Sequence, residues 1–234
     1  MIQETTASVF NTPAQVVTNT VNCEGVMGAG LALEFALRHP DLELVYEQRC
    51  QAGEVRTGRP YLQPVTQAPY QAVLQFPTKR SWRFPSRLEW IDEGLAYIAR
   101  HYQNPQRPIH SLALPRLGCD RGGLDWSQVR SLIERRLGSL PELTVYLCDD
   151  TAPAEGAEAS MLNAYTADHH AGVLPAFLAS KVRAALQETA PPERFRHLAN
   201  VPGVGRQSYA RLFQHYFHQD ATAQLSLPGL LSTS

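Results

Sequence analysis

The chain has 234 residues, of which 44% are hydrophobic, and 21 basic residues against 22 acidic ones leave a formal net charge of −1. This length supplies one full core and room for a small second one, and the charge excludes a polycation, so any nucleic-acid surface must be local. No stretch approaches 18 apolar residues, and residues 1–10 show no basic segment followed by an apolar one. We therefore expect a soluble, cytoplasmic protein with no membrane span.

Short β-rich runs alternate with helical patterns through residue 150. Strands are predicted near residues 2–10 and at 14–21, 61–65, 72–76, 109–114 and 143–147. One helix is predicted from Ser86, where S-R-L-E makes a capping box with Glu89, and another follows Trp126. This alternation predicts an α/β layered domain with a largely parallel or mixed sheet, whose ligands bind beyond the carboxyl ends of strands.

The sequence predicts how the chain divides into domains. Residues 1–150 form the predicted α/β domain, and the small-residue stretch 151–160 is the predicted linker. A small helical segment is expected at 161–222, followed by a flexible tail at 223–234. The four cysteines (Cys23, Cys50, Cys119 and Cys148) show no C-x-x-C spacing, which favours buried thiols in a reducing compartment.

A glycine-rich loop follows the second predicted strand. Residues 19–32 read N-T-V-N-C-E-G-V-M-G-A-G-L-A and lead into a helical pattern. Backbone N–H groups in such a turn approach phosphate oxygens, helped by the partial positive charge of the helix N-terminus. The spacing matches neither the dinucleotide-binding nor the P-loop pattern. By itself the loop fits either a phosphate site or an ordinary tight turn.

Lys79 follows the fourth predicted strand and is one of only two lysines among the 21 basic residues. Arginine stays protonated, whereas lysine serves as a base or nucleophile once its pKa is lowered. We predict that the neighbouring charges of Arg80 and Arg83 lower the pKa of Lys79. Lys79 is therefore the candidate catalytic residue.

The region around Lys79 is cationic and aromatic. No acid occurs from residue 55 to 88, and Trp82 and Phe84 interleave with the arginines. Cations suit phosphate contacts and aromatic rings suit base stacking, so Arg80, Trp82 and Arg83 are candidate nucleic-acid-binding residues. The alternative is an edge loop with solvated arginines, whose aromatic rings complete the core.

A second glycine loop follows the fifth predicted strand. Residues 116–126 read R-L-G-C-D-R-G-G-L-D-W, which again suits close backbone approach to a diphosphate. An acid facing a diphosphate would repel it, so we expect Asp120 to point away or to meet Arg121. Asp125 is interpreted as the N-cap or first-turn acid of the following helix rather than as a catalytic group.

These motifs resemble the macrodomain family. N-x-V-N-C-x-G-V-M-G-x-G-L-A is similar to the first ligand loop of that fold. F-P-T-K-R-x-W-R-x-x-S-R-L-E and G-G-L-D-W resemble the DarG macrodomains, antitoxins of DarT–DarG systems, and more distantly the terminal ADP-ribose protein glycohydrolases. The resemblance covers residues 1–150 and implies a three-layer α/β/α fold with a mixed central sheet.

The resemblance also implies an ADP-ribose site. By this resemblance, Asn22 would contact the distal ribose. The alternative is that Asn22 is a turn residue whose side chain hydrogen-bonds its own backbone. The family's adenine-reading Asp falls near Ser8 here, a weaker acceptor, and the family's usual glycine is replaced by Asp120. The residues implied to line the ligand are Asn22, Gly25, Val26, Met27, Gly28, Gly30, Thr78, Gly118, Cys119, Gly122, Gly123 and Leu124.

The activity implied by the resemblance is removal of ADP-ribose that a DarT-like toxin attaches to thymidine in single-stranded DNA. Lys79 would attack the anomeric carbon or help to open the ring, and water would complete the release without metal or cofactor. Three alternatives stay open: a non-catalytic ADP-ribose reader, a hydrolase of ADP-ribosylated protein carboxylates, and an antitoxin that acts by binding its toxin.

A third motif lies in the C-terminal segment. Residues 198–213 read L-A-N-V-P-G-V-G-R-Q-S-Y-A-R-L-F and resemble the helix-hairpin-helix DNA module. Gly203, Gly205 and Arg206 are therefore candidate contacts to a DNA phosphate, the alternative being a plain glycine turn between packed helices. His215 and His218 are interpreted as surface or core histidines rather than as a metal site. The segment is shorter than the C-terminal domain of DarG, which puts neutralisation of a toxin by direct contact in doubt.

Overall fold

The computed structural model describes residues 1–66 and 68–225, with side chains up to residue 218. The chain divides into two compact units, Met1–Ala152 and Pro153–Ser234. The elements of the first unit, in chain order, are β1 (Ile2–Thr5), η1 (Val9–Asn11), β2 (Val16–Val21), α1 (Gly30–Arg38), α2 (Pro40–Gln51), β3 (Tyr61–Pro64), β4 (Ala72–Pro77), α3 (Leu88–His101), β5 (Ser111–Pro115), α4 (Trp126–Leu137) and β6 (Thr144–Cys148).

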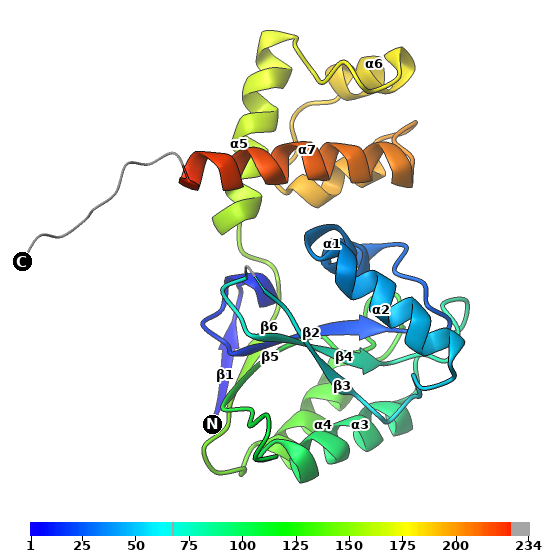
Figure 1. Cartoon of the computed structure of the whole chain (residues 1–234), viewed down its shortest axis with the longest axis vertical. Coiled ribbons are helices and arrows are strands. Elements are labelled where there is room, and N and C mark those ends of the chain that lie inside the picture. The colour runs from blue at the N-terminus through cyan, green and yellow to red at the C-terminus, as the bar shows by residue number, and fades with distance from the viewer. Residues whose placement is uncertain (67, 226–234) are drawn as a thin grey trace, which may run out of the picture. The chain divides into compact units, whose positions relative to one another are not determined.

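A six-stranded sheet in the order β1-β6-β5-β2-β4-β3 forms the centre of this unit (Figure 1). Every neighbouring pair is parallel except β3 and β4, which pair antiparallel, so the sheet is mixed. β2 lies between β5 and β4, and these three strands are parallel. Their carboxyl ends therefore meet at one edge of the sheet, where the loops after them come together.

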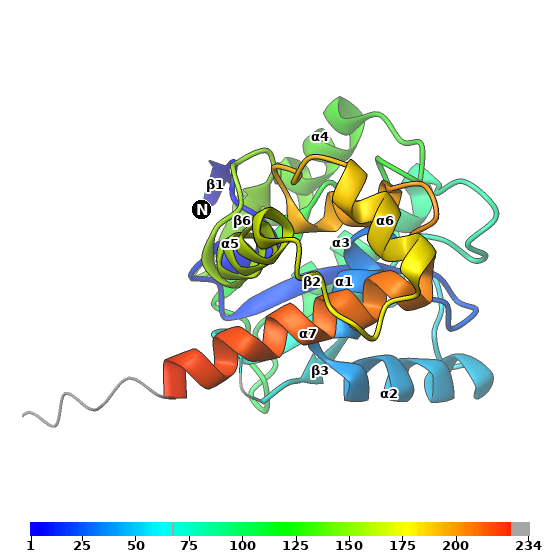
Figure 2. The same cartoon turned by 90° about the horizontal axis from the view of Figure 1, so that it is seen from above.

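Alternation along the strands divides the core into two layers. Val16 and Leu74 contribute to the cluster under α3 and α4, whereas Val17 and Val73 contribute to the cluster under α1 and α2. Successive strand residues point to opposite faces, so each of these strands serves both layers. Figures 1 and 2 show α1 and α2 on one face of the sheet and α3 and α4 on the other. The predicted three-layer α/β/α fold with a mixed sheet is confirmed.

The strand predicted near residues 2–10 is shorter than expected. β1 ends at Thr5, and the 3-10 helix η1 takes up Val9 and Phe10, which are both buried. A strand would send these adjacent side chains to opposite faces, whereas the helical turn packs both against the α1 side of the core.

The capping box predicted at Ser86 and Glu89 is wrong. α3 begins at Leu88 behind Arg87, and no side chain caps it. Ser86 is instead buried, and its backbone N–H donates to the Gly122 carbonyl at 2.9 Å. A contact with a loop distant in sequence has replaced the local cap that the tetrapeptide suggests.

The predicted linker at 151–160 is also partly wrong, because α5 (Gly156–Ala171) begins inside it. Glu158, which lies in the first turn of α5, is buried and pairs with Arg194 at 2.6 Å. The small residues of this stretch carry no apolar period, so the helix depends on tertiary contacts that the local sequence does not show.

The second unit is helical and continues with α6 (Ser180–Glu188), η2 (Phe195–Asn200) and α7 (Arg206–Leu225). Its core is aromatic: the Phe195 ring lies 5.9 Å from the Tyr216 ring and 6.0 Å from the Phe213 ring, edge-on to the latter. α7 extends to Leu225, three residues into the predicted flexible tail, and residues 226–234 lie outside the described part of the chain.

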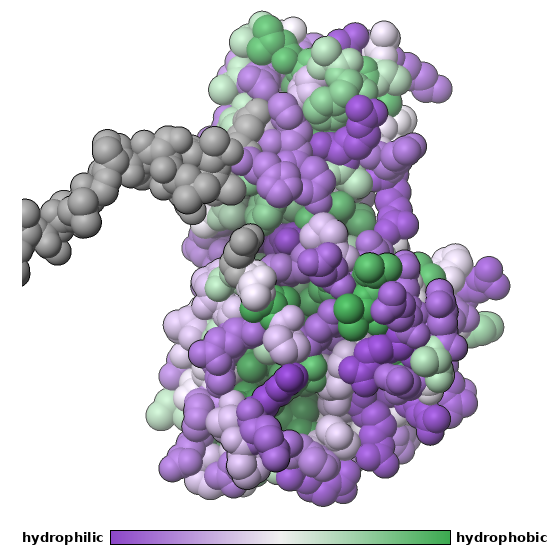
Figure 3. Space-filling view, viewed as in Figure 1, coloured by the Kyte–Doolittle hydropathy of each residue, from purple (hydrophilic) through white to green (hydrophobic). Residues whose placement is uncertain are grey.

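Figure 3 shows hydrophilic side chains over most of the visible face of the first unit, interrupted by hydrophobic ones over α1 and α2. Leu44 and Val45 of α2 are among the exposed hydrophobic residues. Within residues 1–66 and 68–225, no helix combines the length and apolar character needed to span a bilayer.

Candidate active site

Three loops meet at the carboxyl edge of the sheet, after β2, β4 and β5. Backbone hydrogen bonds join them: Cys23 N–H donates to the Arg80 carbonyl at 3.1 Å, and Ser86 N–H donates to the Gly122 carbonyl at 2.9 Å. The Lys79 amine donates to the Arg121 carbonyl. The lysine segment thus lies between the two glycine loops, which are 90 residues apart in sequence and adjacent in the fold.

The first glycine loop (residues 22–30) is held from within by Asn22, which is buried. Its Oδ1 accepts from Glu24 N–H at 2.8 Å, and its Nδ2 donates to the Val26 carbonyl at 2.7 Å. The hydroxyl of buried Tyr46 also donates to the Asn22 backbone carbonyl at 2.9 Å. The Asn22 side chain therefore stabilises the turn, as the structural alternative predicts. The contact of Asn22 with the ribose stays a prediction.

The backbone of this loop requires glycine at some positions and not at others. Gly25 and Gly30 have φ of +81° and +58°, the left-handed region that favours glycine. At Gly28 an added Cβ would meet only the Val26 Cγ1, at 3.5 Å, so the fold does not demand a glycine there. Val26 is exposed, whereas the Met27 side chain is buried in the core. Met27 could therefore contact a ligand only through its backbone.

Lys79 is half-buried beside the second glycine loop. Burial lowers the pKa of its amine below 10.5, and the charge of Arg121 lowers it further. The predicted direction is confirmed, but the predicted cause is wrong, because Arg80 and Arg83 do not contribute. The guanidinium of Arg80 lies over the Trp90 ring at 5.3 Å, and that of Arg83 over the Trp82 ring at 5.1 Å.

The second glycine loop (residues 116–125) is too tight for side chains. A Cβ at Gly122 would lie 2.0 Å from the Gly118 carbonyl oxygen, and one at Gly118 would lie 2.9 Å from Leu124 Cδ1. Gly118 and Gly123 also have φ of +70° and +75°. The loop therefore requires glycine at these positions, and its backbone is the surface that a ligand would meet.

The flanks of the second loop are anchored to the core. Leu124 and Cys119 pack partly buried against the cluster under α3 and α4. Burial raises the pKa of the Cys119 thiol to about 11, with a further contribution from Asp120. Thr78, at the end of β4, is buried, and its N–H donates to the Val21 carbonyl at 2.9 Å.

Two acids of the second glycine loop, and the serine near the family's adenine-reading position, were singled out in the sequence. Asp125 caps α4, accepting from Gln128 N–H at 3.2 Å, which confirms the structural interpretation. For Asp120, the expectation that it points away from the ligand or meets Arg121 stays a prediction. Ser8 is buried at the N-cap position of η1, and its side chain accepts no capping hydrogen bond there.

The aromatic side chains of the cationic strip, defined as residues 80–84, do not complete the core. Trp82 and Phe84 are 53% and 67% exposed, so the core-completing alternative is wrong for both. The carboxylate of Glu24 accepts from Trp82 N–H at 3.3 Å and connects this strip to the first glycine loop.

Sequence reasoning missed several supporting residues. Tyr46 and Glu24 fix the first loop and its contact with the strip, and Cys23 donates its thiol to the Lys79 carbonyl at 3.3 Å. No local pattern signals these contacts, because each one joins segments that only the sheet brings together.

Within the described residues, no group of three or more His, Cys, Asp or Glu side chains is arranged to hold a metal ion.

The C-terminal motif lies in the second unit. Gly203 has a φ of +91°, and Gly205 has open space around its added Cβ. Arg206 is the first residue of α7. The turn thus has the shape of a hairpin before a helix, with backbone N–H groups at the start of α7, and its contact with DNA stays a prediction.

Comparisons with known proteins agree with this geometry. Residues 18–133 match the sequence model of the Macro domain family. A Thermus aquaticus protein named DNA ADP-ribosyl glycohydrolase is 35% identical over 162 residues, which are 68% of this chain and 43% of that protein. This chain thus spans less than half the length of that relative.

Solved structures give the same family. The macrodomain of Mycobacterium tuberculosis DarG has a TM-score of 0.60 and 35% identity, covering 64% of this chain and 98% of that one. Thermosipho africanus DarTG, solved in complex with ADP-ribose, has a TM-score of 0.56 and 34% identity over 62% of this chain and 41% of that one. The first unit is thus a macrodomain in fold. The chain belongs to the macrodomain family.

Proposed function

We propose that this chain is a hydrolase that removes ADP-ribose from ADP-ribosylated DNA, with thymidine-linked, single-stranded DNA as its substrate. The observation that carries the proposal is the position of the Lys79 amine between two glycine loops, beside an exposed arginine–tryptophan strip. The names of the relatives, DNA ADP-ribosyl glycohydrolase and DarG, support the same substrate.

In this proposal ADP-ribose lies across the two glycine loops. The N-terminus of α1 follows the first loop, and Ala29 before it supplies no side-chain cap, so the first-turn N–H groups are available to an anion. The ligand-lining set is the one implied by the resemblance: Asn22, Gly25, Val26, Met27, Gly28, Gly30, Thr78, Gly118, Cys119, Gly122, Gly123 and Leu124. Met27 contributes through its backbone.

The chemical step assigned to Lys79 is a substitution at the anomeric carbon. The Nζ lone pair forms a bond to that carbon, and the bond to the thymine nitrogen breaks, with the electron pair staying on the base, which takes up a proton. Water then adds to the anomeric carbon, the bond to Nζ breaks, and the amine is regenerated. Nearby backbone N–H groups hold the diphosphate during both steps.

The partner proposed for the whole system is a DarT-like ADP-ribosyltransferase, whose modification this chain reverses in the cytoplasm. The DarTG fusion from Thermosipho africanus supports this pairing, because its name places a transferase and a glycohydrolase in one protein. Arg80, Trp82 and Arg83 are proposed to hold the DNA strand beside the reacting nucleotide. Gly203, Gly205 and Arg206 are proposed to add a phosphate contact in the second unit.

The test compares substrates side by side. The full chain is incubated with a single-stranded oligonucleotide ADP-ribosylated on thymidine and with a protein ADP-ribosylated on carboxylates, and release of ADP-ribose is followed. Faster release from DNA is the expected result. Release from the protein alone would replace DNA by protein as substrate. Binding of ADP-ribose without release from either would make the chain a reader.

The rate of this hydrolysis is expected to rise with pH. The reacting form is the neutral amine, so the rate increases as Lys79 loses its proton and levels off above its pKa. Burial and the charge of Arg121 lower that pKa. The rise of the rate with pH should therefore be centred below pH 10.5, where an ordinary lysine titrates. Single-turnover rates across pH measure it, and a flat profile would exclude the amine as the nucleophile.

Replacing Trp82 by alanine is expected to weaken binding of the single-stranded oligonucleotide by roughly 5- to 100-fold, because one base loses its stacking surface. Affinity for free ADP-ribose should stay within about twofold, since the strip lies outside the glycine loops. Fluorescence anisotropy measures the first and calorimetry the second. Val173→Ala, which removes an exposed apolar side chain from the second unit, is the control.

A further inference from the structure

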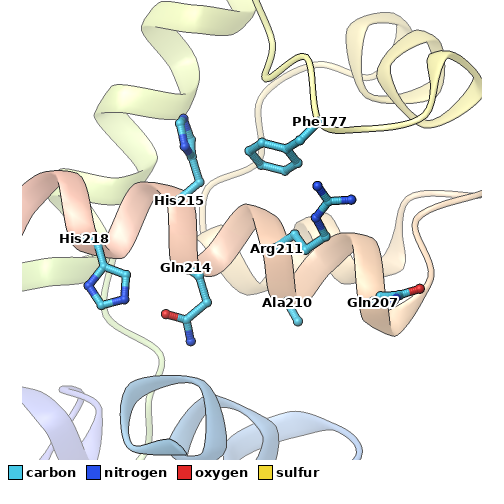
Figure 4. A pocket seen from close by; sticks show the side chains of 7 residues that line it. All are labelled: Phe177, Gln207, Ala210, Arg211, Gln214, His215 and His218. Carbon is cyan, nitrogen blue, oxygen red and sulfur yellow. The ribbon is translucent and has the colours of Figure 1, made fainter.

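The second unit contains a surface groove of about 710 Å³ along one side of α7. Gln207, Arg211, Gln214 and His218 line it at spacings of four, three and four residues, which places them on one face of the helix. Phe177, from the connection between α5 and α6, lies beside His215 of α7 at one side of the groove (Figure 4). The proposed hydrolysis uses none of these residues.

Two contacts organise the groove around an aromatic ring. The guanidinium of Arg211 lies over the Phe177 ring at 4.7 Å, and the His215 ring meets the same ring edge-on at 5.3 Å. Figure 4 shows the Phe177 and Arg211 side chains facing each other across the opening. The groove therefore presents a positive charge, held in place by an aromatic ring that is only half-buried.

The charge of the groove has one sign. Among the side chains that the structure describes, up to residue 218, no carboxylate lines it, and the sequence has no acid from residue 194 to 219. Arg194, the first cation of that stretch, is directed inward to buried Glu158 and contributes nothing to the surface. The neighbouring acid Asp168 accepts from the Tyr216 hydroxyl at 2.9 Å, on the core side of α7. An anionic ligand thus meets no opposing carboxylate along the described part of this face.

We propose that this groove binds single-stranded DNA, as a second contact for the strand that carries the modified nucleotide. The choice of DNA as occupant rests on the proposed function. Arg211 contacts a phosphate, Phe177 supplies the stacking surface, and the glutamine amides reach base edges. The stretch from Gln207 to His218 spans about 16 Å of α7, enough for a few nucleotides of one strand.

The chemistry of the lining favours one strand over a duplex or a protein partner. A duplex contacts cations through its phosphates and keeps its bases stacked on one another, so it leaves Phe177 unused. An acidic peptide would satisfy Arg211 but not the aromatic ring with its flanking amides. Unstacked bases use all three kinds of side chain at once.

The test uses the full chain and an unmodified 15-nucleotide single strand, so that it does not depend on hydrolysis. Arg211→Gln should weaken binding by about tenfold and reduce the slope of log affinity against log salt by about 0.7, the value for one lost phosphate contact. Phe177→Leu, which keeps an apolar side chain at that side of the groove, should weaken binding by about tenfold without changing that slope. Melting curves of both variants check that the unit stays folded.

Lys181→Gln removes one positive charge from α6, outside the groove, and should bind as the parent does. Equal weakening by Lys181→Gln and Arg211→Gln would overturn the proposal in favour of general attraction. Parent-like binding by both groove variants would also overturn it, and an equal loss for a duplex would overturn the single-strand assignment. If the groove variants weaken binding while the parent releases no ADP-ribose from modified DNA, the groove stands and the proposed function fails.

Discussion

Replacement of Lys79 by alanine is expected to slow release of ADP-ribose from the thymidine-modified oligonucleotide by a factor of about 10²–10⁴. The amine is the only group of the lysine that reaches the reacting carbon in the proposed step, and the backbone loops that hold the ligand are unchanged. Affinity for ADP-ribose should therefore stay within about threefold. Single-turnover rates and calorimetric titration separate the two quantities.

Two further variants make this experiment specific. Lys79→Arg keeps the positive charge but cannot supply a neutral amine, so it should be as slow as Lys79→Ala. Lys181→Ala changes the only other lysine of the sequence and should keep the parent rate. Full activity of Lys79→Arg would mean that charge alone matters, and full activity of Lys79→Ala would remove Lys79 from the reaction altogether.

The second large effect is expected at Gly122. A Cβ there would lie 2.0 Å from the Gly118 carbonyl oxygen and 2.6 Å from Ser86 Oγ, and the first of these is backbone that cannot move aside without opening the loop. Gly122→Ala should lower the free energy of unfolding by about 3 kcal/mol, which corresponds to a Tm lower by roughly 5–10 °C. Binding of ADP-ribose should be lost with the loop geometry.

Gly28→Ala is the matched variant in the other glycine loop. Its Cβ meets nothing closer than Val26 Cγ1 at 3.5 Å, so the Tm should be unchanged or slightly higher. If the diphosphate lies against this backbone, affinity for ADP-ribose should nevertheless fall by about tenfold or more. Thermal melts and titrations of both variants distinguish a glycine needed by the fold from one needed by the ligand. Unchanged affinity in Gly28→Ala would move the ligand away from this loop.

The parts of the fold that follow local rules were predictable. Short β-rich runs that alternate with helical patterns indicated the strands, and the strand ends placed both loops and Lys79 at one edge of the sheet. Asp125 was likewise predictable as a cap, because a cap depends on residues three positions apart.

The parts that failed depend on contacts between distant segments. Ser86 matches a capping box in sequence, yet the fold places it under Gly122, 36 residues later. Burial and Arg121 set the pKa of Lys79, whereas its sequence neighbours Arg80 and Arg83 lie over tryptophan rings. Adjacent charges in sequence are a poor guide to electrostatics where side chains leave the backbone in opposite directions.

The internal hydrogen bonds of the first glycine loop have a consequence for recognition. Asn22 and Tyr46 fix the shape of this loop through hydrogen bonds within the chain, so a nucleotide that binds there would lose little affinity to ordering of the loop. In the strip at residues 80–84, by contrast, the Trp82 and Phe84 side chains are exposed. Under the proposed function, substitutions in that strip would change what the ADP-ribose is attached to without changing the loop that binds the nucleotide. Substrate specificity and affinity for ADP-ribose would then evolve separately.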